Sequence, residues 1–485
     1  MQPGPLPSQP APQGKHRLSY RWLSLYIAAG LLLGSGLGLL LTSHAARQTA
    51  TSQPGAQHPV SGLTFLSPTS TPNPTSTATS IAQQPLPTHH FAFGVDNAPG
   101  AVQNLNDMRS TNGAAFDYRY QYLSAGVNTG HGWETWDNPA GTFATYYIQE
   151  SVKNSYIPTF VYYELLQSNG TCGSCGEQKK DLSNLANPSV MNAYYANWAL
   201  LMQKIGAASQ KTLVIVEPDL WGYMQQSVVG GSNSAAAVPA SVANSGYAAV
   251  AGLPNTAQGF AWALLHLRDL YAPNALLALH ASNWATLIDI SSNTDPGLNV
   301  GSVAQTEAHF LLSAGMQGNP NGISRWNLLS NDVADHDSGQ SGIWWDRTNT
   351  KLPNFSRYLQ FIGALTADTG LHVLMWQVPV GNQYFDTENN SAGHEQDNRA
   401  EYILSHVPDF VHAGILGVMF GAGNGGTEYN DARKDGTTNP APISTYQCNL
   451  CNNHQSQYPD DDGGYLRIFV GQYYRSGGYG LPAGW

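Results

Sequence analysis

The stretch AQGFAWALLHLRDLYAPNALLALHA (257–281) joins a helical pattern directly to a strand pattern. Its first part (257–272) is an amphipathic helix candidate. Its last part, ALLALHA (275–281), is a short apolar run typical of a buried strand. A helix that leads at once into a buried strand is half of a βαβ unit, so this stretch predicts a parallel sheet.

Seven further apolar, β-rich runs occur in the domain that we place at 89–485, and helical patterns such as 190–207 and 354–365 lie between them. Eight alternating units over about 395 residues predict an α/β fold of the (β/α)₈ TIM-like barrel type with long loops. A doubly wound open sheet is the alternative, but no glycine-rich phosphate loop follows the first run. The eight runs are FAFGVD (91–96), FDYRYQYLS (116–124), IPTFVYYEL (157–165), LVIVEPD (213–219), ALLALHA (275–281), WNLLSND (326–332), LHVLMWQVP (371–379) and ILGVMFGAG (415–423).

The N-terminus has the pattern of a targeting segment. Residues 1–22 form a basic tail that is expected to stay in the cytoplasm, and residues 23–42 are an uncharged run long enough to span a bilayer of about 30 Å. This run is either a retained signal anchor or a cleaved signal peptide. Residues 43–88 are rich in Ser, Thr and Pro and predict a disordered linker. The barrel domain is therefore expected on the extracellular face of the membrane or in the medium.

The composition narrows the class of partner. Charged residues make up only 11% of the chain and its net charge is −11, without a Lys/Arg cluster in the globular part. A nucleic-acid partner would need a basic face, so none is expected. A surface rich in uncharged hydrogen-bonding groups suits a neutral polyhydroxyl ligand such as a polysaccharide or oligosaccharide.

Polar and acidic residues follow the predicted strands, where a barrel carries its chemistry. Two carboxyl groups that converge on one cleft are what glycoside hydrolysis needs, one as proton donor and one as nucleophile or base. The predicted catalytic residues are Glu217 and Asp219 after the fourth run and Asp335 and Asp337 after the sixth. The alternatives are a structural Glu217/Asp219 pair around Pro218 and a solvated or calcium-binding loop at 335–337.

Substrate-binding candidates share a place at or near the strand ends and are polar or aromatic, since a flat ring complements the apolar face of a pyranose. Some of the tryptophans are expected in the core instead, and a histidine on an apolar run, as His280 is, is usually a core residue with its hydrogen bonds satisfied. The candidates are Asp96, Tyr122, Trp133, Tyr163, Glu164, Trp221, His280, Trp284, Trp376, Gln377 and Asn382.

The segment IVEPDLWGY (215–223) resembles the Glu-Pro-Asp segment at a strand end of family 6 cellulases, which are distorted α/β barrels with catalytic aspartates. It is also similar to the Asn-Glu-Pro strand of the large retaining-hydrolase clan. The first resemblance implies a role for Asp219, and the second implies an acid/base role for Glu217. The retaining clan ends its seventh strand with a nucleophilic Glu, but this chain has Gln377. No aspartate-rich segment of the family 6 type precedes 215–223.

The four cysteines form two Cys-x-x-Cys pairs, Cys172/Cys175 and Cys448/Cys451. Disulfides are the expected state outside the cell, and a structural zinc shared by both pairs is the alternative. No cofactor is predicted, and neither calcium nor zinc is required by these patterns.

These features predict an extracellular glycoside hydrolase that cleaves a polysaccharide with carboxyl groups. The alternative is a surface carbohydrate-binding or structural barrel without turnover, which the missing seventh-strand Glu favours. The oligomeric state is left open.

Overall fold

The computed structural model describes residues 88–320, 322–333, 343–379, 397–421 and 465–485. These residues form a closed barrel of eight parallel strands in sequence order, which confirms the predicted α/β barrel. The strands are β1 (Ala92–Asp96), β2 (Tyr118–Leu123), β3 (Ile157–Tyr162), β4 (Thr212–Val216), β5 (Ala275–His280), β6 (Leu328–Asn331), β7 (Val373–Pro379) and β8 (Ile415–Gly421).

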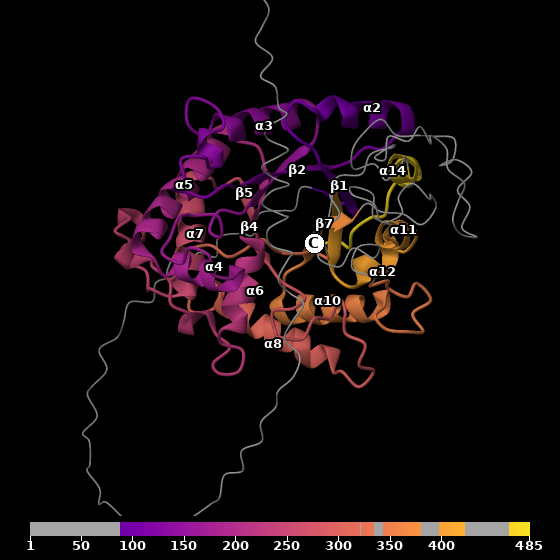
Figure 1. Ribbon diagram of the computed structural model, residues 1–485. Coiled ribbons are helices and arrows are strands. Elements are labelled where there is room, and N and C mark those ends of the chain that lie inside the picture. Colours follow the sequence, from indigo (N-terminus) through magenta and orange to yellow (C-terminus); the bar gives the residue numbers. More distant parts are fainter. Residues whose placement is uncertain (1–87, 321, 334–342, 380–396, 422–464) are drawn as a thin grey trace, which may run out of the picture. The chain divides into compact units, whose positions relative to one another are not determined.

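Helices surround the barrel, and Figure 1 shows them as a ring outside the strands. Asn187, Thr256 and Asn354 each cap the N-terminus of a helix by accepting backbone N–H bonds, so local sequence sets where these helices begin. The helices are α2 (Val102–Asn112), α3 (Thr142–Lys153), α4 (Glu177–Leu185), α5 (Pro188–Ala208), α6 (Pro218–Gln226), α7 (Ala257–Tyr271), α8 (Val300–Ser313), α10 (Phe355–Thr369), α11 (Arg399–Ser405), α12 (Val407–His412) and α14 (Tyr465–Arg475).

The barrel has two apolar cores because alternate residues of each strand point to opposite faces. One core lies between the strands and the helices, and the other fills the barrel interior. The interior core consists of Ala92, Tyr118, Tyr120, Val161, Leu213, Ile215, Leu276, Ala278, Leu328, Leu374, Trp376 and Met419. The barrel is therefore a packed body, and a ligand must bind at one of its ends.

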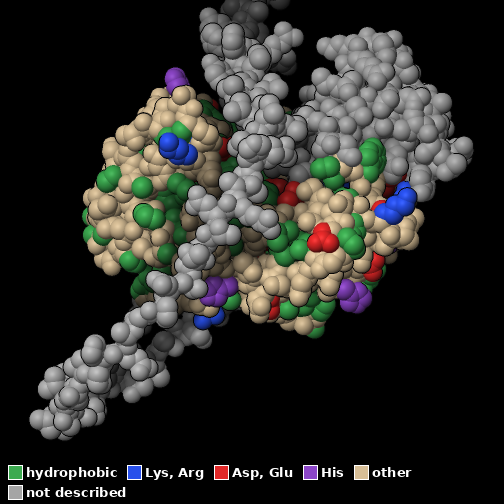
Figure 2. All heavy atoms as spheres, turned by 60° about the horizontal axis from the view of Figure 1, so that its bottom comes forward, with side chains coloured by type: hydrophobic (Ala, Val, Ile, Leu, Met, Phe, Trp, Pro, Cys, Tyr) green, Lys and Arg blue, Asp and Glu red, His purple; other side chains and the backbone are tan. Residues whose placement is uncertain are grey.

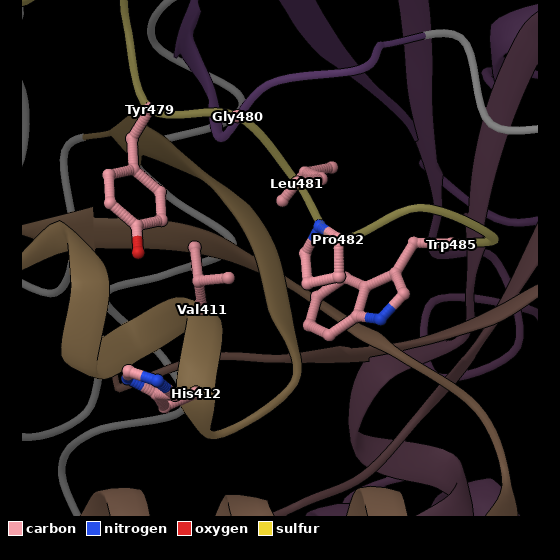
Figure 3. A pocket seen from close by; sticks show the side chains of 7 residues that line it. All are labelled: Val411, His412, Tyr479, Gly480, Leu481, Pro482 and Trp485. Carbon is pink, nitrogen blue, oxygen red and sulfur yellow. The ribbon is translucent and has the colours of Figure 1, made fainter.

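The C-terminal segment covers the N-terminal end of the barrel. Leu481 donates its backbone N–H to His89, and Phe91 donates to Tyr479, at 3.0 and 2.8 Å. The Trp485 ring stacks on His372, just before β7, with ring centroids 3.9 Å apart. A hollow of about 270 Å³ remains here, lined by Val411, His412, Tyr479, Gly480, Leu481, Pro482 and Trp485 (Figure 3). It lies at the opposite end from the strand C-termini, so it is not the predicted site.

The surface in Figure 2 carries few charged side chains among many uncharged ones, in line with the low charge content of the chain. The chain divides into two units, Met1–Ser76 and Thr77–Trp485, and all described residues belong to the second. The predicted segments 1–22 and 23–42, and 43–88 except for its last residue, lie outside the described residues and stay predictions. Within the described part of the chain, no helix is both long and apolar enough to cross a bilayer.

Candidate functional site

A polar layer lies above the apolar interior at the C-terminal end of the barrel. Alternation along the strands places it there: two residues beyond Ala278 comes His280, and two beyond Tyr120 comes Tyr122. In the same way, Leu328 on β6 is followed by Ser330 and then by Asp332. On several strands, therefore, the last apolar inward residue is followed by a polar inward residue two positions later.

The floor of this layer is the Trp376 ring, which is only 2% exposed. The Tyr122 ring meets it at 5.8 Å in an edge-on arrangement, and the Tyr122 hydroxyl donates to Gln377 Oε1 at 2.8 Å. Gln377 has a positive φ of 48° beside an irregularity in the pairing of β7 with β8. This left-handed turn interrupts the alternation, so consecutive residues Trp376 and Gln377 both serve the same end of the barrel.

His280 and Asp332 meet beside the same indole ring. His280 Nδ1 lies 3.4 Å from Trp376 Nε1 and 3.1 Å from Ser330 Oγ, and its Nε2 lies 3.4 Å from Asp332 Oδ2. Burial lowers the pKa of His280 to about 3, so the ring is neutral and its contact with Asp332 is not an ion pair. The Asp332 side chain, which directly follows β6, is 20% exposed.

Asp96 at the end of β1 brings a second carboxyl group to this face. Burial raises its pKa to about 7, against the charge of Arg119 and the backbone N–H of Asn97, which favour the ionised form. Arg119 itself is held by Asn97 Oδ1 at 2.7 Å and by Glu150 at 2.7 Å, so its charge is shared with other groups. A carboxyl group of this kind holds a proton near neutral pH.

Asp219 lies in the first turn of α6. The helix dipole stabilises a negative charge at that position. Its charge acts on Tyr163 and Asp181, and the Tyr163 hydroxyl donates to Glu177 Oε1 at 3.3 Å. Asp219 is partly exposed, whereas Asp181 is buried. The structure therefore presents Asp219, and not its neighbour Asp181, to solvent at this end of the barrel.

The other two acidic candidates are buried. Glu217 is 1% exposed, and its carboxylate accepts the backbone N–H groups of Glu164 and Leu165, each at 3.1 Å. Burial raises the pKa of Glu217 to about 8, opposed by these N–H groups and Tyr194. Burial also raises the pKa of Glu164, which is not exposed at all. These placements correct the expectation that both face a cleft and favour the structural alternative for Glu217.

Two predicted stacking platforms are also core residues. Trp133 and Trp221 are at most 1% exposed, and their indole N–H groups donate to Asn197 Oδ1 and to the backbone oxygen of Val216. Neither ring has a face available to a sugar, so the binding role expected for them is wrong. Trp376, which is 2% exposed, has no free face either, and it forms the floor beneath the site instead of a stacking platform. Trp284 is different, because it is partly exposed and its ring lies 4.9 Å from that of Tyr223.

Several predicted residues lie outside the described residues, and their roles stay predictions. They are Asp335, Asp337, Asn382, Cys448 and Cys451. Cys172 and Cys175 form a disulfide with each other, in agreement with the expected oxidised state of this pair. Within the described ranges, no group of three or more His, Cys, Asp and Glu side chains is arranged to hold a metal ion.

Sequence reasoning placed Asp332 at the end of the sixth run but chose Asp335 and Asp337, three and five residues later, as the catalytic candidates. Counting in twos from Leu328, which is buried in the interior, reaches Asp332 and identifies it as an inward position. The support of His280 by Trp376 and Ser330 had no sequence signal, because these residues come together only through the pairing of strands.

No protein-family model and no curated protein matches this sequence. Among solved structures, it is similar to an endoglucanase Cel6 from Mycobacterium tuberculosis, with 13% identity, 59% of this chain and 72% of that chain covered, and a TM-score of 0.29. A modular endo-β-1,4-mannanase from Cellulomonas fimi matches at 11% identity, over 70% and 67% of the two chains, with a TM-score of 0.39. A β-glucosidase from Thermotoga maritima matches at 9% identity, over 66% and 76%, with a TM-score of 0.37.

These solved structures are glycoside hydrolases, but likeness at this level identifies neither a substrate nor a catalytic residue. What the fold and the site define together is an α/β barrel with a polar, acidic and aromatic C-terminal end. Its described members are Asp96, Tyr122, Tyr163, Asp219, His280, Trp284, Asp332, Trp376 and Gln377.

Proposed function

We propose that the protein is an extracellular glycoside hydrolase that cleaves a polysaccharide at the C-terminal end of its barrel. The observation that carries the proposal is the placing of carboxyl groups from β1, β6 and the start of α6 at that end, around the rings of Tyr122 and Trp376. Glycosidic bond cleavage needs a protonated and an ionised carboxyl group on the two sides of the bond.

The environments of these carboxyl groups differ, so that one can be protonated while another is ionised. Asp96 holds its proton near neutral pH and is proposed as the general acid. Asp332 faces the neutral His280 and is proposed as the ionised partner, which attacks the anomeric carbon or activates a water molecule. Asp219, at the helix N-terminus, is retained as a further catalytic candidate, and Asp335 and Asp337 remain candidates from the sequence.

The proposed location follows from the sequence alone. The run at 23–42 is proposed either to anchor the protein in the membrane, with the linker at 43–88 holding the barrel off the outer face, or to be cleaved as a signal peptide on secretion. A polymer substrate is consistent with this location, because a large polysaccharide does not enter a cell.

A polysaccharide panel tests the proposal. Purified full-length protein is incubated with cellulose, mannan, xylan, starch and other soluble and insoluble glycans, and new reducing ends are measured against the heat-denatured protein. We expect release from at least one glycan. Retention on an insoluble glycan without any release would instead support the non-catalytic binding protein, and neither release nor retention would exclude both.

A further inference from the structure

The buried imidazole of His280 has a defined place between three groups. It ends β5, is 2% exposed, and points its two ring nitrogens in opposite directions. Nδ1 meets Trp376 Nε1 at 3.4 Å and Ser330 Oγ at 3.1 Å, while Nε2 meets Asp332 Oδ2 at 3.4 Å. A core histidine without a function needs only to have its hydrogen bonds satisfied, but this one also touches a partly exposed carboxylate.

The indole of Trp376 determines which nitrogen carries the proton. An indole N–H is a donor only, so the atom that it faces must be an acceptor. Nδ1 is therefore unprotonated, and the proton of the neutral ring is on Nε2. The Ser330 hydroxyl also suits an unprotonated Nδ1, because it can rotate to donate.

A protonated, cationic ring does not fit this position. It would place an N–H on Nδ1 opposite the indole N–H, so that two donors faced each other, and it would have to be charged in a buried setting. Burial lowers the pKa of His280 to about 3, in agreement with this geometry. The ring thus stays a neutral donor through Nε2 across the pH range in which most enzymes work.

Other charged and titratable groups lie near Asp332. Tyr358 on α10 experiences the charge of Asp332, and Arg399 on α11 acts on Tyr358 in the opposite direction. Arg399 is itself paired with Asp397. From β5 comes the His280 ring, whose Nε2 lies 3.4 Å from Asp332 Oδ2.

We infer that His280 is a positioning residue: held as its Nε2–H tautomer by Trp376, it donates to Asp332 Oδ2 and keeps that carboxylate aimed at the C-terminal end of the barrel. The distance of 3.4 Å is long for such a bond, and contacts of this kind often shorten when substrate binds. The tautomer assignment is independent of the proposed function. The effect of His280 on catalysis rests on the proposed function.

Nitrogen-15 NMR tests the tautomer directly in the full-length protein labelled at its histidines. The His280 signal is assigned by its loss in His280→Leu. We expect the shifts of an unprotonated Nδ1 and a protonated Nε2, unchanged between pH 5 and pH 9. Trp376→Phe removes the indole donor that opposes a proton on Nδ1, so the ring should become cationic at a higher pH than in the wild-type protein, whereas Ser330→Ala, which keeps the indole, should not show this change. A cationic ring or an Nδ1–H tautomer in the wild-type protein would overturn the inference, whether or not the protein hydrolyses a glycan.

Kinetics test the positioning role on the glycan that the wild-type protein degrades. His280→Leu should lower kcat by about ten- to a hundredfold with little change in KM, because the carboxylate is no longer held in place. The acid limb of the kcat/KM profile should move to higher pH, since the ionised carboxylate has lost a donor. His280→Gln, whose amide can both accept from Trp376 and donate to Asp332, should restore most of kcat and the original profile.

A pH profile of His280→Leu that matches the wild-type profile would leave His280 as a structural residue and overturn the positioning role. If the wild-type protein degrades no glycan, the proposed function fails while the NMR result still decides the tautomer. Failure of the inference and failure of the proposed function are therefore distinguished by different measurements.

Discussion

The backbone angle of one residue, Glu217, decides what its carboxylate does. Alternation from Leu213 and Ile215 would point Glu217 into the barrel, as it does for His280 on β5. Its φ of 44° instead turns the carboxylate toward the backbone N–H groups of Glu164 and Leu165, which follow β3. The carboxylate thus ties the loop after β3 to the end of β4, and this link supports the adjacent Asp219.

Removal of the Glu217 side chain should therefore unfold the protein more easily. Glu217→Ala leaves two backbone donors buried without acceptors, so we expect a loss of about 2–4 kcal/mol in the free energy of unfolding. Glu217→Gln keeps one acceptor oxygen and should lose less. Urea titration followed by tryptophan fluorescence measures both, and an unchanged midpoint for Glu217→Ala would show that the link is not structural.

Two tryptophans, one buried and one partly exposed, allow the effect of a substitution on stability to be compared with its effect on binding. Trp221 packs on Phe260 with ring centroids 5.6 Å apart and is buried, whereas Trp284 is partly exposed beside Tyr223. Trp221→Ala should cost about 3–5 kcal/mol of stability. Trp284→Ala should change stability little but weaken retention on the glycan that the protein binds. Equal retention by Trp284→Ala and wild type in a pull-down assay would remove Trp284 from the site.

These residues also show where sequence reasoning ends. A tryptophan is apolar and large wherever it occurs, so nothing in the sequence separates Trp133 and Trp221 in the core from Trp284 near the surface. The acidic residues near a strand end are predictable, but which of them faces the C-terminal end of the barrel depends on one dihedral angle at Glu217 and on the strand register at Asp332. Those two quantities are set by tertiary packing.

At the scale of the elements, all eight strands were predictable. Most of them are largely apolar runs because a barrel strand is buried on both faces, whereas β2 alternates tyrosines with Arg119 and Gln121. The helices at 188–208, 257–271 and 355–369 were predictable from their amphipathic patterns. The pairing irregularity of β7 was not, because Gln377 lies within an ordinary apolar run and its positive φ has no local signal.

The irregularity in β7 predicts that a substitution of Gln377 can lower activity while leaving stability almost unchanged. A non-glycine residue at positive φ is strained by about 1 kcal/mol, and glycine relieves this. Gln377→Gly also loses the contact with the Tyr122 hydroxyl, so we expect its free energy of unfolding to stay within about 1 kcal/mol of wild type. Glycan hydrolysis should fall by about tenfold or more, because the side chain at the barrel end is lost.

Ser209 provides the control for this change. It ends α5 with a φ of 55° and is exposed, far from the strand C-termini. Ser209→Gly should raise stability by about 0.5–1 kcal/mol without any change in hydrolysis. Equal activity of Gln377→Gly and Ser209→Gly would show that the β7 irregularity has no part in the site.

For the whole molecule, the buried carboxyl groups predict that the folded protein is more stable at acidic pH than at alkaline pH. Glu164, Asp181 and Glu307 are each at most 1% exposed. Burial raises the pKa of all three well above ordinary values. The folded state therefore binds more protons than the unfolded state above about pH 4.5, and stability falls as pH rises from there.

Each such group lowers the free energy of unfolding by about 1.4 kcal/mol per pH unit up to its own folded pKa. Urea unfolding of the wild-type protein should show higher stability at pH 5 than at pH 8. Asp181→Asn should flatten this dependence, whereas Asp368→Asn, at an exposed position on α10, should not. Stability that rises from pH 5 to pH 8 would mean that these carboxyl groups are solvated or paired in solution.

We propose that Asp96, at the end of β1, and Asp332, just after β6, act together on a glycosidic bond. The most direct measurement is the initial rate of reducing-end release from the glycan degraded by the wild-type protein, compared with Asp332→Asn and Asp96→Asn. We predict losses of about a hundredfold or more for each variant, with urea midpoints near that of the wild-type protein. Rates within threefold of wild type for both variants would contradict the claim.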